Sequence, residues 1–154
     1  MSITGSCLCG AIRYEVSGSP ISTILCHCDN CRKATGSSFM ANGFYMQSQL
    51  RVLAGHNSLK VYQDSATASG STVSRSFCTN CGSSLFATNK DNPLAKDAVI
   101  IASGTMDLGP SAAEWAPQRE FFCMRRREWL PPLENTQTSQ MLESVENIQK
   151  GTSC

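Results

Sequence analysis

Residues 78–82 read CTNCG, a pair of cysteines spaced to bind one metal ion and closed by a glycine. The glycine permits the left-handed turn that brings the two sulfurs together. A second half-site, CLCG, occupies residues 7–10. Because a structural zinc takes four protein ligands, joining the half-sites gives a complete site that would hold together segments about 70 residues apart. The predicted ligands of this stabilising zinc are Cys7, Cys9, Cys78 and Cys81.

The remaining cysteine-rich stretch, CHCDNC at residues 26–31, offers three sulfurs on one loop. A catalytic zinc keeps three protein ligands and leaves its fourth position for water or substrate. We therefore expect Cys26, Cys28 and Cys31 to hold a second zinc with an open position, which makes two zinc ions per chain. A fourth protein ligand would close this site and remove the enzymatic interpretation; the side chains considered are His27, Asp29, His56 and Cys123.

Ligation by three thiolates favours particular chemistry at the second site. The centre is negatively charged, so it polarises water less than a three-histidine site, and a substrate thiol is a natural soft ligand. Arg32 and Lys33 follow Cys31 and are candidates for offsetting this charge or binding substrate carboxylates. The alternative for this basic pair is a solvated turn. His27 is a candidate for orienting the metal loop or contacting substrate.

The bulk composition fits one small domain. The chain has 154 residues, 41% hydrophobic content and a formal net charge of +1. This charge gives no reason to expect nucleic acid or an anionic membrane as a partner. The N-terminal residues show no secretory signal, and no uncharged apolar stretch reaches the length of a membrane span. We expect a cytoplasmic protein, in which reduced cysteines bind metal rather than form disulfides.

Alternation of apolar and polar residues indicates a mainly β fold. One face of a strand is predicted at Ile12, Tyr14 and Val16, another at Leu59 and Val61, and a third at Val73, Arg75 and Phe77. Further strands are expected at residues 22–26, 38–45, 50–53, 84–88, 98–102 and 120–125. Antiparallel pairing is expected throughout, since turn residues punctuate the strands at short intervals.

The C-terminal residues differ in composition from the rest of the chain. We predict a zinc-binding β domain over residues 1–132 and a polar tail over residues 133–154. Apolar residues recur in the tail at helical spacing, so it is expected to form a short amphipathic helix behind Thr138 or Ser139, or to be disordered. These apolar residues are Met141, Leu142, Val145 and Ile148.

The order of these motifs resembles the glutathione-dependent formaldehyde-activating enzyme family. The likeness covers residues 5 to 130, and includes Gly5 before the first cysteines, Gly36 after the three-cysteine loop, and a closing segment from Pro117 to Trp129. The resemblance implies a β-tent fold, a structural zinc at the four-cysteine site and a second zinc at the three-cysteine site. It also implies a carbon–sulfur lyase, with adduct formation between glutathione and formaldehyde as the name-giving reaction.

One position departs from the pattern of that family. Many members have a histidine where this chain has Glu120, which we expect to pair with Arg119 or Arg125. The leading hypothesis is a zinc-dependent lyase acting on a glutathione or other thiol adduct of a small electrophile. The alternatives are a hydrolase or hydratase using the same open zinc on a small organic substrate, and a non-catalytic zinc-binding interaction module. The second is suggested by the resemblance to centromere protein V within the same broad family. Association as a homodimer is left open.

Overall fold

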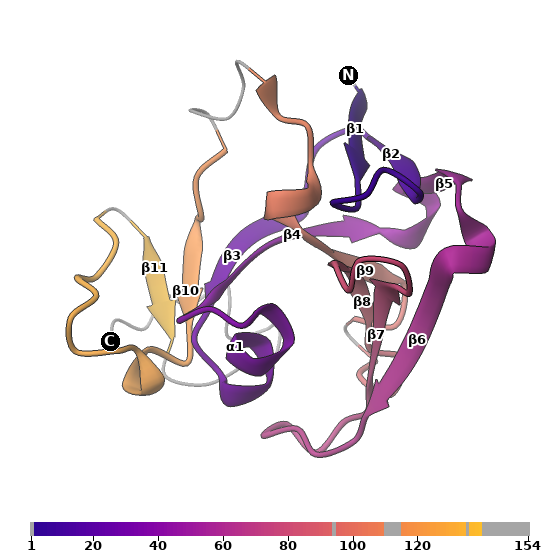
Figure 1. Ribbon diagram of the computed structural model, residues 1–154. Coiled ribbons are helices and arrows are strands. Elements are labelled where there is room, and N and C mark those ends of the chain that lie inside the picture. Colours follow the sequence, from indigo (N-terminus) through magenta and orange to yellow (C-terminus); the bar gives the residue numbers. More distant parts are fainter. Residues whose placement is uncertain (1, 94, 110–114, 135, 140–154) are drawn as a thin grey trace.

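The described part of the chain folds into two β-sheets and one short helix (Figure 1). The computed structural model describes residues 2–93, 95–109, 115–134 and 136–139. The smaller sheet has the order β1-β2-β5, with both pairings antiparallel. Its strands are β1 (Ser2–Ser6), β2 (Arg13–Ser17) and β5 (Leu50–Ala54).

The larger sheet has eight strands in the order β11-β10-β3-β4-β9-β8-β7-β6. Strands β4 and β9 lie at its middle, where β4 pairs with the distant β9 rather than with β5. The bounds are β3 (Ser22–Cys26), β4 (Met40–Met46), β6 (Leu59–Asp64), β7 (Val73–Cys78), β8 (Ser84–Thr88), β9 (Ala98–Ala102), β10 (Arg119–Phe121) and β11 (Gln137–Ser139). Short 3-10 turns join them at Gln47–Gln49, His56–Ser58, Ser103–Thr105 and Cys123–Arg125.

The main apolar core lies between the two sheets. Tyr14 of β2 is fully buried, and its ring packs edge-on against Phe86 of β8 with 4.9 Å between ring centroids. The Tyr14 hydroxyl is 2.8 Å from the Thr105 hydroxyl. Gly5 is required beside this ring, because a β-carbon there would lie 2.2 Å from the Tyr14 side chain. Cys7 and Cys78 belong to the same core, so the four-cysteine site is continuous with it.

Helix α1 (Asp29–Thr35) follows β3 directly and begins inside the three-cysteine stretch. The Cys28 sulfur accepts a hydrogen bond from the backbone N–H of Cys31 at 3.3 Å, which caps the N-terminus of the helix. The helix ends at Gly36, whose φ of 63° is in the left-handed region that favours glycine. The sequence interpretation expected a loop here, so the helical turn is a correction.

The mainly β fold predicted from alternation is confirmed. Three strands have the predicted bounds, namely 22–26, 84–88 and 98–102. The strand predicted at 120–125 is shorter, because Phe122 adopts a left-handed conformation and a 3-10 turn follows it. Strand β1 was not predicted.

Two pairings depart from the expected antiparallel arrangement. Strand β10 runs parallel to both β3 and β11. Strand β11 also corrects the expectation of a helix or disorder for residues 137–139, which extend the sheet instead. The predicted helical residues from Met141 to Ile148 lie outside the described residues, and the division at residue 132 stays a prediction.

Candidate metal centres

The four-cysteine site joins the β1–β2 turn to the turn between β7 and β8. Its sulfurs all lie within 4.8 Å of one another. Cys9 Sγ is 3.5 Å from Cys7 Sγ and 3.8 Å from Cys78 Sγ. Four sulfurs about 2.3 Å from a tetrahedral zinc would be about 3.8 Å apart, so the spacing fits this ion. Cys7, Cys9, Cys78 and Cys81 thus lie together in one group, and their binding of zinc stays a prediction.

Neighbouring groups orient these sulfurs. The backbone N–H of Ile12 donates to Cys7 Sγ at 3.3 Å, and the Ser83 hydroxyl lies 3.2 Å from Cys81 Sγ. The hydrogen bond with the Ser83 side chain, followed by backbone N–H donors, lowers the pKa of the Cys81 thiol to about 5. A thiol that loses its proton readily is prepared for metal binding, since the thiolate is the ligand.

The three-cysteine site lies where β3 ends and α1 begins. Cys26, Cys28 and Cys31 form a group whose sulfurs lie within 4.8 Å of one another. Among the described residues, none of the four side chains considered as a fourth ligand joins that group. Cys26 and Cys28 are buried with Phe121 and Phe122 in a second apolar cluster. Three sulfurs at this spacing also fit zinc.

The three thiols are electrostatically unequal. Hydrogen bonds from the Cys26 and Cys31 thiols lower the pKa of Cys28 to about 2. The same hydrogen bond with Cys28, together with that of Cys31 and burial, raises the pKa of Cys26 well above its usual range. Cys28 is therefore the thiol of this group that loses its proton most readily. A cation at their centre would release the remaining protons and bind three thiolates.

His27, between two of these cysteines, is fully buried and turned to a different partner. Its Nε2 is 2.7 Å from Oε1 of Glu120, which is also fully buried. The Arg126 guanidinium donates to the other Glu120 oxygen at 3.2 Å. The sequence interpretation expected Glu120 to pair with Arg119 or Arg125, so this network is a correction. The backbone N–H of His27 also donates to the Phe121 carbonyl at 3.0 Å, which ties the cysteine loop to β10.

Arg32 and Lys33 have different surroundings, although they are adjacent. The Arg32 guanidinium pairs with Asp29 and donates to the Arg125 carbonyl at 3.4 Å, while Asp29 also pairs with Arg125 at 2.8 Å. The Arg32 guanidinium, first, and the Arg125 charge, less strongly, lower the pKa of the Asp29 carboxyl. Lys33 is exposed and lines an outer groove of about 660 Å³. Of the two, Lys33 is the one that faces open space beside the site.

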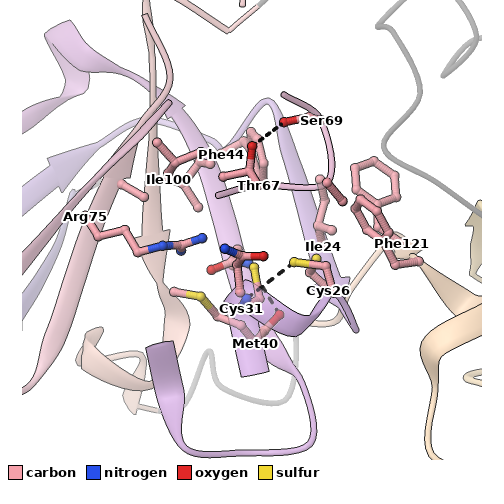
Figure 2. A pocket seen from close by; sticks show the side chains of 17 residues that line it. Ile24, Cys26, Cys31, Met40, Phe44, Thr67, Ser69, Arg75, Ile100 and Phe121 are labelled. Carbon is pink, nitrogen blue, oxygen red and sulfur yellow. Dashed lines mark hydrogen bonds between the residues drawn. The ribbon is translucent and has the colours of Figure 1, made fainter. Parts of the chain in front are cut away.

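An apolar cavity of about 90 Å³ adjoins the three sulfurs (Figure 2). Its walls come from β3, β4, β7, β8, β9 and β10, from α1 and from the loop between β6 and β7. Apolar side chains dominate the lining, among them Ile24, Met40, Phe44, Ile100, Phe121 and Phe122. The left-handed conformation of Phe122, with a φ of 57°, is uncommon for a residue with a bulky side chain. It occurs where the chain turns from β10 against the cysteine loop.

Arg75 is the cationic side chain among the residues that line this cavity, and sequence reasoning did not select it. Figure 2 shows it reaching from β7 toward Cys31. Its Nε donates to Asp64 at 2.8 Å, and the Asn30 amide donates to both Asp64 oxygens at 2.9 and 3.0 Å. The signal was present in the sequence, because Arg75 shares its predicted strand face with the apolar Val73 and Phe77.

Comparisons with known proteins identify relatives of this chain. Residues 2–125 match the family described as glutathione-dependent formaldehyde-activating enzymes. A Halomonas elongata protein provisionally named as such an enzyme is 33% identical over 87 residues, which cover 56% of this chain and 55% of that protein. An uncharacterized lyase of Schizosaccharomyces pombe is 34% identical over 91 residues, covering 58% of this chain and 61% of the relative. The matches thus span less than two thirds of these relatives.

A solved structure supports the fold. A crystal structure of a Rhodobacter sphaeroides protein superposes with a TM-score of 0.56 and 22% identity, covering 74% of this chain and 97% of that one. Among the described residues, none of the helices combines the length and apolar composition needed to cross a bilayer. The match over residues 2–125, which includes all seven clustered cysteines, shows that this chain belongs to the glutathione-dependent formaldehyde-activating enzyme family.

Proposed function

We propose that this protein is a zinc-dependent carbon–sulfur lyase that acts on a glutathione or other thiol adduct of a small electrophile. The observation that carries the proposal is the three-sulfur group of Cys26, Cys28 and Cys31, which faces an apolar cavity. The lyase name of one relative and the name of the family support the same reaction class.

The chain provides two groups of zinc ligands with different roles. Cys7, Cys9, Cys78 and Cys81 would hold a structural zinc beside the main core. Cys26, Cys28 and Cys31 would hold the second zinc. When bound there, zinc would supply a Lewis-acid position for a soft fourth ligand such as a substrate sulfur.

The shape of the site separates the two parts of a thiol adduct. The cavity is small and apolar, so it suits the carbon group carried on sulfur. The outer groove is larger, and it shares Asn30, Thr67, Ala68 and Arg75 with the cavity. Charged side chains line this groove, including Lys33 and Arg125. The remainder of a thiol the size of glutathione would lie there, with its carboxylates near these cations.

The remaining site residues hold this arrangement in place. Glu120 fixes His27, and the His27 backbone is bonded to β10, so the cysteine loop keeps one position relative to the cavity wall. Arg32 and Asp29 tie α1 to the segment after β10. In this proposal His27 and Arg32 act by positioning the site, and Lys33 contacts the thiol.

Cobalt substitution tests the proposal, because cobalt reports on its ligands through visible absorption bands. Titration with glutathione should change the bands of the second site. The Cys28→Ala variant should lose this response and the turnover of thiol adducts while keeping the fold, because the four-cysteine site is separate from Cys28. A response to anions that compete with water, but not to thiols, would instead favour a hydrolase or hydratase. No response to either would favour a non-catalytic zinc module.

Two lysine variants test whether the groove binds the thiol. Lys33→Ala should weaken glutathione binding by about 0.5 to 1 kcal/mol, as expected for an exposed charge pair. Lys60→Ala is the matched control, because Lys60 is also exposed but lies on β6 outside both the cavity and the groove. Equal affinities of the two variants would show that Lys33 does not contact the thiol.

A further inference from the structure

Arg75 has hydrogen-bond donors that its own neighbours do not use. Its Nε is bonded to Asp64. Among the described residues, no acceptor bonds to either terminal amino group. The Arg75 side chain is only 16% exposed, and the cavity that it borders is lined mainly by apolar groups. A guanidinium kept in such a place with unused donors is well suited to a polar atom of a ligand.

The position of the guanidinium is fixed by a chain of side chains. Asp64 is buried, and it accepts hydrogen bonds from both Arg75 and Asn30. Asn30 also donates to the Ala66 carbonyl at 3.0 Å, which anchors the loop between β6 and β7. Asn30 lies on α1, one residue before the ligand Cys31. The cysteine group and the arginine are therefore held relative to each other by the same set of contacts.

The charges at the site indicate what the free donors would meet. Burial opposes the charged form of Arg75, but the hydrogen bond to Asp64 and the negative charges of Cys31 and Cys28 raise the pKa of Arg75 above its usual range. Arg75 and Asp64 together are neutral, and three thiolates with zinc carry one negative charge. Figure 2 shows the Arg75 side chain reaching toward Cys31, so its terminal amino groups would lie beside a carbon attached to a substrate sulfur.

We propose that Arg75 donates a hydrogen bond to the oxygen of a hemithioacetal, on the carbon bonded to the substrate sulfur. This inference rests on the proposed function, takes as its substrate the aldehyde–thiol adduct that the name of the family implies, and adds a donor to the substrate oxygen. In the elimination, the hydroxyl loses its proton to solvent and its oxygen forms the C=O bond. The electron pair of the broken C–S bond remains on sulfur as a thiolate. Arg75 would stabilise the negative charge on this oxygen after its proton has left and before the C–S bond has broken.

The cavity limits the aldehyde. A cavity of 150 Å³ lined by apolar side chains holds benzene. The cavity here is about 90 Å³, so it would hold a hydrogen, methyl or ethyl substituent and exclude an aromatic ring. We therefore expect adducts of formaldehyde and acetaldehyde to be accepted and those of benzaldehyde to be rejected.

Two small thiols test the assignment without turnover. Thioacetate carries an oxygen on the carbon bonded to sulfur, as a hemithioacetal does. Ethanethiol has the same heavy-atom chain without the oxygen. Binding of both to the zinc-loaded protein would be measured by calorimetry in wild type, Arg75→Lys and Arg75→Met. Comparing the ratio of the two affinities between variants cancels the different acidities of the probes.

The choice of variants allows for misfolding. Arg75→Met leaves Asp64 buried without its cation, and this can destabilise the protein. The double variant Arg75→Met with Asp64→Asn removes both charges, and the residue at position 64 can still accept from Asn30. Arg51→Met is the matched control, because Arg51 is exposed and pairs with Glu15 in the smaller sheet. Thermal unfolding of each variant checks that the fold is retained.

The expected result is a loss of thioacetate affinity of about ten- to a hundredfold in the double variant, with ethanethiol affinity unchanged. The thioacetate affinity of Arg75→Lys should lie between those of wild type and the double variant, since lysine keeps the charge but loses the two-pronged donor. In turnover of the formaldehyde adduct, kcat/KM should fall about a hundred- to a thousandfold, because Arg75 contacts the substrate oxygen in the bound adduct and in the transition state. An unchanged ratio of thioacetate to ethanethiol affinity in the double variant would overturn the role of Arg75 and leave the proposed function standing. If wild type binds neither thiol, the proposed function fails and this inference fails with it.

Discussion

The buried carboxylate of Glu120 should be one of the most sensitive positions for stability outside the cysteines. Its side chain is 0% exposed, and each of its oxygens has one partner, Nε2 of His27 at 2.7 Å and Nη1 of Arg126 at 3.2 Å. Among the described residues, the other His27 ring nitrogen, Nδ1, has no partner. Glu120→Ala would therefore leave the buried imidazole without a hydrogen bond and Arg126 without its anion.

The expected loss of folding stability follows from these contacts. Removing one partner of a buried ion pair costs about 3 to 5 kcal/mol, compared with a total stability of about 5 to 15 kcal/mol for a small domain. Glu120→Gln keeps the shape and one acceptor oxygen. It can satisfy one of its two donors, so we expect a smaller loss of about 1 to 3 kcal/mol.

Urea unfolding followed by circular dichroism measures both effects on the zinc-loaded protein. Glu128→Ala is the control, because Glu128 is exposed on the same C-terminal segment and should change stability by less than about 0.5 kcal/mol. The reasoning would be refuted if Glu120→Ala and Glu128→Ala had the same free energy of unfolding. It would also be refuted if Glu120→Gln cost as much as Glu120→Ala.

The other predictions concern the metal ions. Elemental analysis should find two zinc ions per chain, one for each cysteine group, and a single ion would contradict the two-site interpretation. Cys78→Ser should prevent stable folding, because a structural zinc contributes on the order of 10 kcal/mol of coupled binding and folding free energy. Cys28→Ser should lose only the second ion. If Cys78→Ser and wild type had the same melting temperature, the assignment of Cys78 to the structural site would be wrong. Zinc affinity at the second site, measured by competition with a chelator, should fall as the pH is lowered. The raised pKa of Cys26 means that a proton must leave this thiol when the metal binds, and an affinity independent of pH would show that the thiols are already ionised.

The sequence predicts much of this structure where the relevant signal is local. Residues 22–26, 84–88 and 98–102 were predicted as strands with the observed bounds, because each is a short run of apolar and β-branched residues. The cysteine pairs and the three-cysteine group were recognised for a similar reason, whereas the two distant pairs were joined only because a structural zinc takes four ligands. Two sulfurs one or two residues apart can reach one ion only through a tight turn, so spacing along the chain determines geometry in space.

Contacts between distant segments were not predictable in this way. Glu120 meets His27 across 93 residues of sequence, and the pairing depends on β10 lying parallel to β3. Parallel pairing has no hairpin signal in the sequence. The expectation that Glu120 would pair with a neighbouring arginine therefore chose the nearest cation along the chain rather than the nearest in the fold.

Arg75 shows why the distinction matters for function. Alternation correctly placed it on one face of a strand, but nothing in that strand reveals that the cysteine loop lies opposite. The link is made by Asn30 and Asp64, one from the helix after the cysteines and one from the end of β6. The metal ligands are thus marked by local spacing, whereas the group proposed to act on the substrate oxygen is assembled by the sheet. A sequence comparison that reads only the cysteines would identify the metal sites of a relative and leave its substrate undetermined, because the residue at the position of Arg75 and the size of the cavity are set independently of the ligands.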